Sequence, residues 1–87
     1  MPFQYEDHRI YMKDENGKLI AEITFPFVSD RKVNIDHTFV DDSLRGQGVA
    51  GQLVQAAIGQ IRKAGWDMAA TCSYAQAWLE RHPEACG

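Results

Sequence analysis

Cysteine and proline are scarce in this chain of 87 residues, with two cysteines and three prolines. Small secreted domains rely on several disulfides, so Cys72 and Cys86 are too few for such a framework, and we expect both to be reduced thiols. No repeat or linker-like tract divides the sequence. A chain of this length buries only roughly 60–65% of its unfolded surface, which supports one core. We therefore expect a single domain over residues 1–87.

The chain also lacks a basic excess and long apolar runs. Nine Lys and Arg residues against 12 Asp and Glu residues give a net charge of −3, without the cationic cluster that a phosphate backbone requires. Nucleic-acid binding is therefore not expected. No apolar run approaches the roughly 18–20 residues that span a bilayer, and the first residues lack the pattern of a secretory leader. We expect a cytoplasmic protein that does not bind membranes.

Alternating apolar residues predict strands in the first half of the chain. The alternation covers residues 9–13 and 19–25, and Asn16-Gly17 between them is the favoured pair for a tight hairpin turn. A third strand is predicted over residues 33–40. Its alternation places the following residues on one face: Val33, Ile35, His37 and Phe39.

Helical periodicity replaces this alternation further along the chain. Apolar residues recur at helical spacing over residues 48–64, and Gly65 supplies a stop. Residues 66–71 predict a buried strand, and a capping pattern at Ser73 predicts a second helix that ends at Pro83. A strand, a helix and a strand in succession imply parallel pairing. The predicted fold is α+β in β-β-β-α-β-α order, with a mixed sheet of antiparallel N-terminal strands and a parallel β-α-β unit.

The run from Arg45 to Ala50 joins the third strand to the long helix and is the most informative segment. Its glycines allow successive backbone N–H groups to converge, and the helix N-terminus adds a positive potential, so the run suits a pyrophosphate. It does not end in Gly-Lys-Ser/Thr, which excludes a Walker A loop. Composition alone leaves an alternative open, in which the glycines only permit a tight turn and close packing.

The pattern Arg-x-x-Gly-x-Ala in this run, between a strand and an amphipathic helix, resembles the acetyl-CoA pyrophosphate motif of the GNAT N-acetyltransferases. The resemblance covers residues 9–84 and implies a truncated GNAT fold with N-acetyltransferase activity. Three further motifs are similar to those of the small YjdJ-type members of that superfamily: His37-Thr38, Cys72-x-Tyr74 and His82-Pro83-Glu84.

The resemblance implies acetyl-CoA as the cosubstrate and assigns residues to it. The backbone near Phe39 and Val40 would pair with the pantetheine arm and polarise the thioester carbonyl. Strands three and four splay apart in this superfamily, and the acetyl group enters the opening. The backbone N–H groups of the loop would bind the pyrophosphate: Arg45, Gly46, Gln47, Gly48, Val49 and Ala50.

Three side chains are candidates for catalysis. Cys72 precedes a helix whose dipole would lower a thiol pKa; it could accept the acetyl group or only line the pocket. Tyr74 matches the tyrosine that protonates the departing CoA thiolate in this superfamily, and its alternative is a half-buried aromatic residue. His37 is suited to taking a proton from an ammonium group, although a histidine on an apolar face is often a hydrogen-bonded core residue. Asp36 is an alternative base.

The sequence leaves more than one class of function open. The leading interpretation is an N-acetyltransferase in which an amine attacks the thioester directly or through acetyl-Cys72, with a small-molecule amine or a protein lysine or N-terminal amine as the acceptor. The alternatives are a CoA-binding or acyl-CoA-binding module with little activity, and a structural protein that kept the fold without the ligand. Cys72, His82 and Cys86 lack zinc-ligand spacing, so no metal is expected. An uncovered sheet edge suggests a monomer or a weak homodimer.

Overall fold

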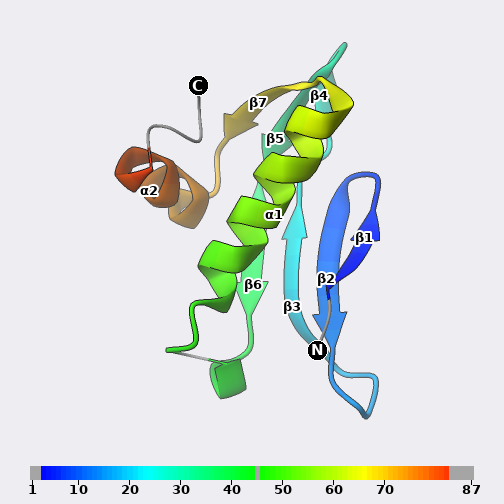
Figure 1. Cartoon of the computed structure of the whole chain (residues 1–87), viewed down its shortest axis with the longest axis vertical. Helices are drawn as coiled ribbons and strands as arrows, with labels where there is room; N and C mark the ends of the chain where they lie inside the picture. Colours follow the sequence, from blue (N-terminus) through cyan, green and yellow to red (C-terminus); the bar gives the residue numbers. More distant parts are fainter. Residues whose placement is uncertain (1–2, 45, 83–87) are drawn as a thin grey trace.

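The computed structural model describes residues 3–44 and 46–82. The predicted order of secondary structure is present, with two further short strands and a division of the predicted third strand (Figure 1). In chain order the elements are β1 (Gln4–Glu6), β2 (Arg9–Lys13), β3 (Leu19–Thr24), β4 (Phe27–Ser29), β5 (Lys32–Ile35), β6 (His37–Val40), the 3₁₀ helix η1 (Asp42–Leu44), α1 (Val49–Ala64), β7 (Asp67–Ala70) and α2 (Ser73–Arg81).

The strands form two sheets that share the chain segment β5–β6. The larger sheet is antiparallel, in the order β1-β2-β3-β6, and the smaller sheet has the order β4-β5-β7. β4 and β5 are antiparallel, whereas β5 and β7 are parallel, as a strand–helix–strand succession predicts. The α+β class with both kinds of pairing is therefore confirmed, and the division into two sheets is a feature that the sequence pattern did not indicate.

A β-bulge at Asp36 divides the predicted third strand. The Asp36 N–H donates to the Thr24 carbonyl at 3.2 Å, and the next residue, His37, is the register partner of the same Thr24. Two residues opposite one is the definition of a bulge, which bends a strand and shifts its alternation by one residue. The chain consequently leaves the smaller sheet at Ile35 and enters the larger sheet at His37.

The bulge moves His37 to the face of the larger sheet that lies away from the core. Thr38 is paired opposite Ile23, which is fully buried, so Thr38 points toward the core and His37 points away from it. The His37 side chain is 54% exposed. The prediction that His37 shares a face with the buried Ile35 was wrong, because it assumed an unbroken alternation through Asp36.

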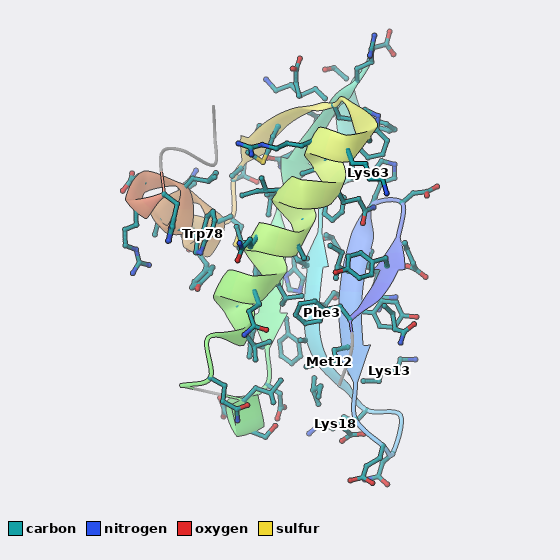
Figure 2. The ribbon with its side chains drawn as sticks, in the orientation of Figure 1. Phe3, Met12, Lys13, Lys18, Lys63 and Trp78 are labelled. Carbon is teal, nitrogen blue, oxygen red and sulfur yellow. The ribbon has the colours of Figure 1, made fainter. Side chains whose placement is uncertain are left out.

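Helix α1 lies across the inner face of the larger sheet and completes the core (Figure 1). The side chain of Met12, on β2, belongs to this core, and Phe3 packs against it (Figure 2). Gly65 has a φ of 79° and closes α1, as its position after the periodic segment predicts. Within the described ranges, no helix has the length and apolar character needed to cross a membrane. The buried residues of α1 recur at helical spacing: Val49, Leu53, Val54, Ala57, Ile58 and Ile61.

Candidate functional site

The two sheets diverge where β6 turns away from β5 and β7, and a pocket lies beside this divergence. β6 is an edge strand of the larger sheet, so its backbone on the side away from β3 has no strand partner among the described residues. A cavity of about 290 Å³ opens here, between β6, the start of α1 and the start of α2. We call it the loop pocket, and it is lined by Val40, Leu44, Gly46, Gly48, Val49, Ala50 and Tyr74.

Backbone conformation accounts for two glycines of the loop. Gly46 and Gly48 have φ values of 80° and 71°, in the left-handed region that glycine adopts without strain. No atom lies within 4 Å of the position that a Cβ would take at either residue, so the space beside them is open. The alternative of close helix–sheet packing therefore does not explain these two glycines.

The start of α1 is available to an anion. Gly48 is its N-cap residue and has no side chain, and no side-chain hydrogen bond caps the helix. The first N–H groups of a helix have no partner within the helix, and they lie at the positive end of its dipole. Together with the open space at Gly46 and Gly48, this geometry fits a pyrophosphate group.

Gly51, in contrast to Gly46 and Gly48, allows close packing between two helices. A Cβ at this position would lie 3.3 Å from Trp78 Nε1 and 3.6 Å from the Tyr74 hydroxyl oxygen. Trp78 projects from α2 toward α1 (Figure 2) and stacks on His82, with 4.1 Å between the ring centroids. Helix α2 thus docks on the first turns of α1 through Trp78, and this docking holds Tyr74 at the loop pocket.

Cys72 lies directly before α2, at the end of β7. Its Sγ and Thr38 Oγ1 are hydrogen-bonded at 3.4 Å, and the hydroxyl donates to the sulfur when the thiol is deprotonated, so this bond ties the segment after β7 to β6. Burial alone raises the pKa of the Cys72 thiol, but the hydrogen bond with Thr38 and the backbone N–H groups of Ala75 and Tyr74 outweigh it, so the pKa lies below its ordinary value. Cys72 is a free, half-buried cysteine with increased thiolate character.

The structure brings most, but not all, of the predicted residues together. Tyr74 lines the loop pocket and is 37% exposed. The Gln47 N–H already donates to the Leu44 carbonyl at 3.3 Å. Arg45, Cys86 and the last two residues of the His82-Pro83-Glu84 motif lie outside the described residues. The loop pocket contains these predicted cofactor residues: Val40, Gly46, Gly48, Val49 and Ala50.

His37 lies on the opposite face of β6 from the contact between Thr38 and Cys72. Its Nε2 is 3.6 Å from Glu22 Oε1, and Glu22 Oε2 is 2.5 Å from Arg9 Nε. Glu22 was not among the residues predicted from the sequence. The available signal was a carboxylate in an otherwise apolar strand, but the pairing of β3 with β6 was needed to bring it next to His37. Within residues 3–44 and 46–82, no group of His, Cys, Asp or Glu residues is arranged to hold a metal ion.

Comparison with solved structures gives the same architecture. A GCN5-like protein from Staphylococcus aureus superposes with a TM-score of 0.79 and 34% identity, over 97% of this chain and 82% of that chain. An acetyltransferase from Bacillus cereus superposes with a TM-score of 0.69 and 24% identity, over 93% of this chain and 58% of that chain. The second likeness shows the fold alone.

Sequence comparison identifies the family. Protein NATD1 from Gallus gallus is 32% identical over 63 residues, which are 72% of this chain and 57% of that protein. The chain therefore spans little more than half the length of this curated relative. A profile of the family described as GCN5-related N-acetyl-transferase matches residues 9–86. This match covers nearly the whole chain, and it shows that the chain belongs to the GCN5-related N-acetyltransferase (GNAT) family.

Proposed function

We propose that this domain transfers the acetyl group of acetyl-CoA to the amine of an acceptor. The observation that carries the proposal is the loop pocket, which joins an uncapped helix N-terminus to the unpaired edge of β6 and to Tyr74. Membership of the GNAT family supports acyl transfer as the reaction class.

The backbone of the loop would hold the pyrophosphate of the cosubstrate. The space beside Gly46 and Gly48 is open, so an anion at the positive end of α1 would reach the N–H groups of these two residues and of Ala50 in the first turn of the helix. The Gln47 N–H would join them only if its 3.3 Å bond to the Leu44 carbonyl opened. Arg45 was predicted to contribute its N–H group as well, and this assignment stays a prediction.

The free edge of β6 would bind the pantetheine arm. An extended amide chain can pair with an exposed strand edge through backbone hydrogen bonds alone. Phe39 and Val40 lie in this edge strand, and Val40 also lines the loop pocket. A backbone N–H group at this edge that faced the thioester oxygen would stabilise the negative charge that develops on it during attack.

Two routes to the product use the residues beside the pocket. In the direct route, the amine nitrogen forms a bond to the thioester carbon and the carbon–sulfur bond breaks. The Tyr74 hydroxyl then protonates the CoA thiolate and recovers a proton from the new amide nitrogen. In the two-step route, the Cys72 thiolate takes the acetyl group first, which releases CoA, and the amine then attacks acetyl-Cys72. The lowered pKa of the Cys72 thiol supports the second route.

One observation favours a second candidate function, a CoA-binding module with little transfer activity. Of the described residues that line the loop pocket, Tyr74 alone has a titratable side chain, and His37 lies on the other face of β6. An acceptor that entered only on the inner face would meet no general base, and the site would then bind CoA without deprotonating the acceptor.

We place the chain among the YjdJ-type members of the GNAT family, on the order of its His-Thr, Cys-x-Tyr and His-Pro-Glu motifs. The acceptor would be a small-molecule amine or a lysine or N-terminal amine of a protein. Residues 1–87 would act as one cytoplasmic domain, as a monomer or a weak homodimer.

A matched pair of glycine variants tests the proposed function. Gly48→Ala and Gly17→Ala both place a Cβ at a positive φ, 71° and 82° respectively, with no atom of the protein within 4 Å. Each should destabilise the fold by about 1–2 kcal/mol through backbone strain. Only Gly48→Ala puts a methyl group in the loop pocket, so it alone should weaken acetyl-CoA binding in calorimetry. Equal binding by both variants would contradict the proposed site.

Turnover distinguishes the enzyme from the binding module. The wild-type protein is incubated with acetyl-CoA and a panel of primary amines, and released CoA thiol is measured. Release that depends on an amine supports the transferase. Binding of acetyl-CoA without any release supports the binding module, and absence of binding overturns both. Intact mass after incubation without an amine tests the two-step route, which requires an acetyl adduct that is absent from Cys72→Ala.

A further inference from the structure

The outer face of the larger sheet, which lies away from α1, carries an ordered array of polar and aromatic side chains. The side chains of this array, which are named below, are all at least partly exposed. Helix α1 contacts β2, β3 and β6 from the other side, where the buried residues of these strands lie (Figure 1). The strand register sets two rows across β2, β3 and β6, and we call them the outer-face array: Tyr11, Glu22 and Phe39, and Arg9, Thr24 and His37.

Glu22 is the centre of the outer-face array. One carboxylate oxygen lies 2.5 Å from Arg9 Nε, and the other lies 3.6 Å from His37 Nε2. Arg9 is held in turn by Glu6, at 3.4 Å, and its guanidinium lies over the Tyr11 ring, 4.0 Å from the centroid. The Glu22 side chain is only 18% exposed. The Glu22 carboxylate is therefore held by Arg9 on β2 through one oxygen, and its other oxygen faces His37.

The bulge connects this array to the proposed site of the thioester. His37 and Thr38 are consecutive residues of β6 whose side chains point to opposite faces, and Thr38 contacts Cys72 on the inner face. Because β6 is an edge strand, a thioester bound along its free edge can be reached from both faces. An acceptor that came from the outer face would meet His37 without passing Cys72 or the loop pocket.

We propose that the acceptor amine reaches the thioester across the outer-face array, that His37 takes its proton, and that Glu22 is the positioning residue that holds His37 and stabilises the imidazolium. This inference rests on the proposed acetyl transfer. The acceptor ammonium gives one proton to an imidazole nitrogen, which frees the lone pair that attacks the thioester carbon. The carbon–sulfur bond breaks, the second nitrogen proton passes to the CoA thiolate, and His37 releases its proton to water.

The charges around His37 indicate the class of acceptor. Around the array, the carboxylates of Asp36, Glu22 and Glu6 outnumber the cations of Arg9 and Lys13, which suits a cationic amine. The rings of Tyr11 and Phe39 flank Glu22 on the neighbouring strands and provide an apolar surface for the stem of the acceptor. We therefore infer a primary ammonium on an apolar stem. The charged groups near His37, from its own segment and from each strand of the sheet, are Asp36, Glu22 on β3, Arg9 and Lys13 on β2, and Glu6 on β1.

Steady-state kinetics of four variants test this inference. With saturating acetyl-CoA and the best amine of the panel, His37→Gln should lower kcat roughly 100-fold or more, which is typical of the loss of a general base. Glu22→Gln should lower kcat by less than His37→Gln does, because it leaves the imidazole in place and removes only the carboxylate that holds it. Glu22→Asp, which keeps the charge, should recover part of the loss. Glu15→Gln, in the exposed hairpin turn, makes the same charge change and should leave kcat unchanged.

Binding of acetyl-CoA separates this inference from the proposed function. Calorimetry should give the same affinity for wild type, His37→Gln and Glu22→Gln, because neither side chain lines the loop pocket. Unchanged kcat in both variants would overturn the inference while acetyl transfer stood. Loss of acetyl-CoA affinity in either variant would also overturn it, since the array would then serve the cosubstrate. If the wild type binds acetyl-CoA and no amine releases CoA, the inference fails together with the transferase.

An NMR titration provides a measurement that does not depend on turnover. The best amine of the panel, or methylammonium if none is turned over, is added to the protein saturated with CoA. The inference predicts that backbone signals of Tyr11, Glu22 and Phe39 shift in wild type. Shifts confined to the groove between α1 and α2, around Gln55 and Trp78, would place the acceptor elsewhere and overturn the inference.

Discussion

Gly51 and Gly59 both lie within α1, but only Gly51 is packed against α2. A Cβ at Gly51 would stand 3.3 Å from Trp78 Nε1, whereas a Cβ at Gly59 would have no atom within 4 Å. Replacing either glycine by leucine removes a penalty of about 0.5–1 kcal/mol that glycine imposes on a helix interior. At Gly59 this gain should be realised. At Gly51 it should be exceeded by overpacking, which costs about 1–3 kcal/mol or more.

The two leucine variants should therefore differ in stability by more than about 1 kcal/mol, with Gly59→Leu above wild type and Gly51→Leu below it. Since 1 kcal/mol shifts the Tm of a domain of this size by roughly 4–8 °C, differential scanning calorimetry resolves the difference. Gly51→Leu should also lower turnover, because it displaces the helix that holds Tyr74 at the loop pocket. Equal Tm values for the two variants would refute the docking of α2 through Trp78.

Two further predictions concern titrating groups near the loop. The lowered pKa of the Cys72 thiol predicts alkylation by iodoacetamide at lower pH than for an ordinary thiol, and Thr38→Val should move this profile to higher pH because it removes a hydrogen bond that lowers the pKa. The Ser43 hydroxyl and N–H hold the pKa of Asp41 below its usual value, with a smaller contribution from Lys18. The stability from Asp41 is thus present above the pKa of the unfolded chain and is lost as the pH falls through the folded value. An NMR titration should show a raised Asp41 pKa in Ser43→Ala, and an unchanged value would contradict the assigned cause.

Local signals in the sequence were sufficient for the hairpin, the long helix and the loop. Asn16-Gly17 forms the turn between β2 and β3, and Gly65 ends α1, because each has a backbone conformation that glycine adopts readily. Gly46 and Gly48 likewise have positive φ values, which agrees with the prediction that the loop needs glycine for its backbone conformation. Such features depend on a few neighbouring residues, which is why the sequence predicts them.

The features that the sequence did not predict depend on pairing between distant segments. The bulge at Asp36 is defined by its partner Thr24, twelve residues away in the chain, and nothing in the local alternation marks it. It divides one predicted strand between two sheets and reverses the face of His37. The proximity of Glu22 to His37 follows from the same pairing. The two short strands β1 and β4 were not predicted, because three exposed residues show no alternation of buried and exposed positions.

The measurement that tests the central claim most directly is an NMR map of the amide signals on addition of CoA. The account predicts that the largest shifts fall on Gly46, Gly48 and Ala50, with further shifts at Val40 and Cys72, because the pyrophosphate lies at the start of α1 and the sulfur points into the divergence of β6 and β7. Shifts confined to the groove between α1 and α2, or an absence of binding, would contradict it.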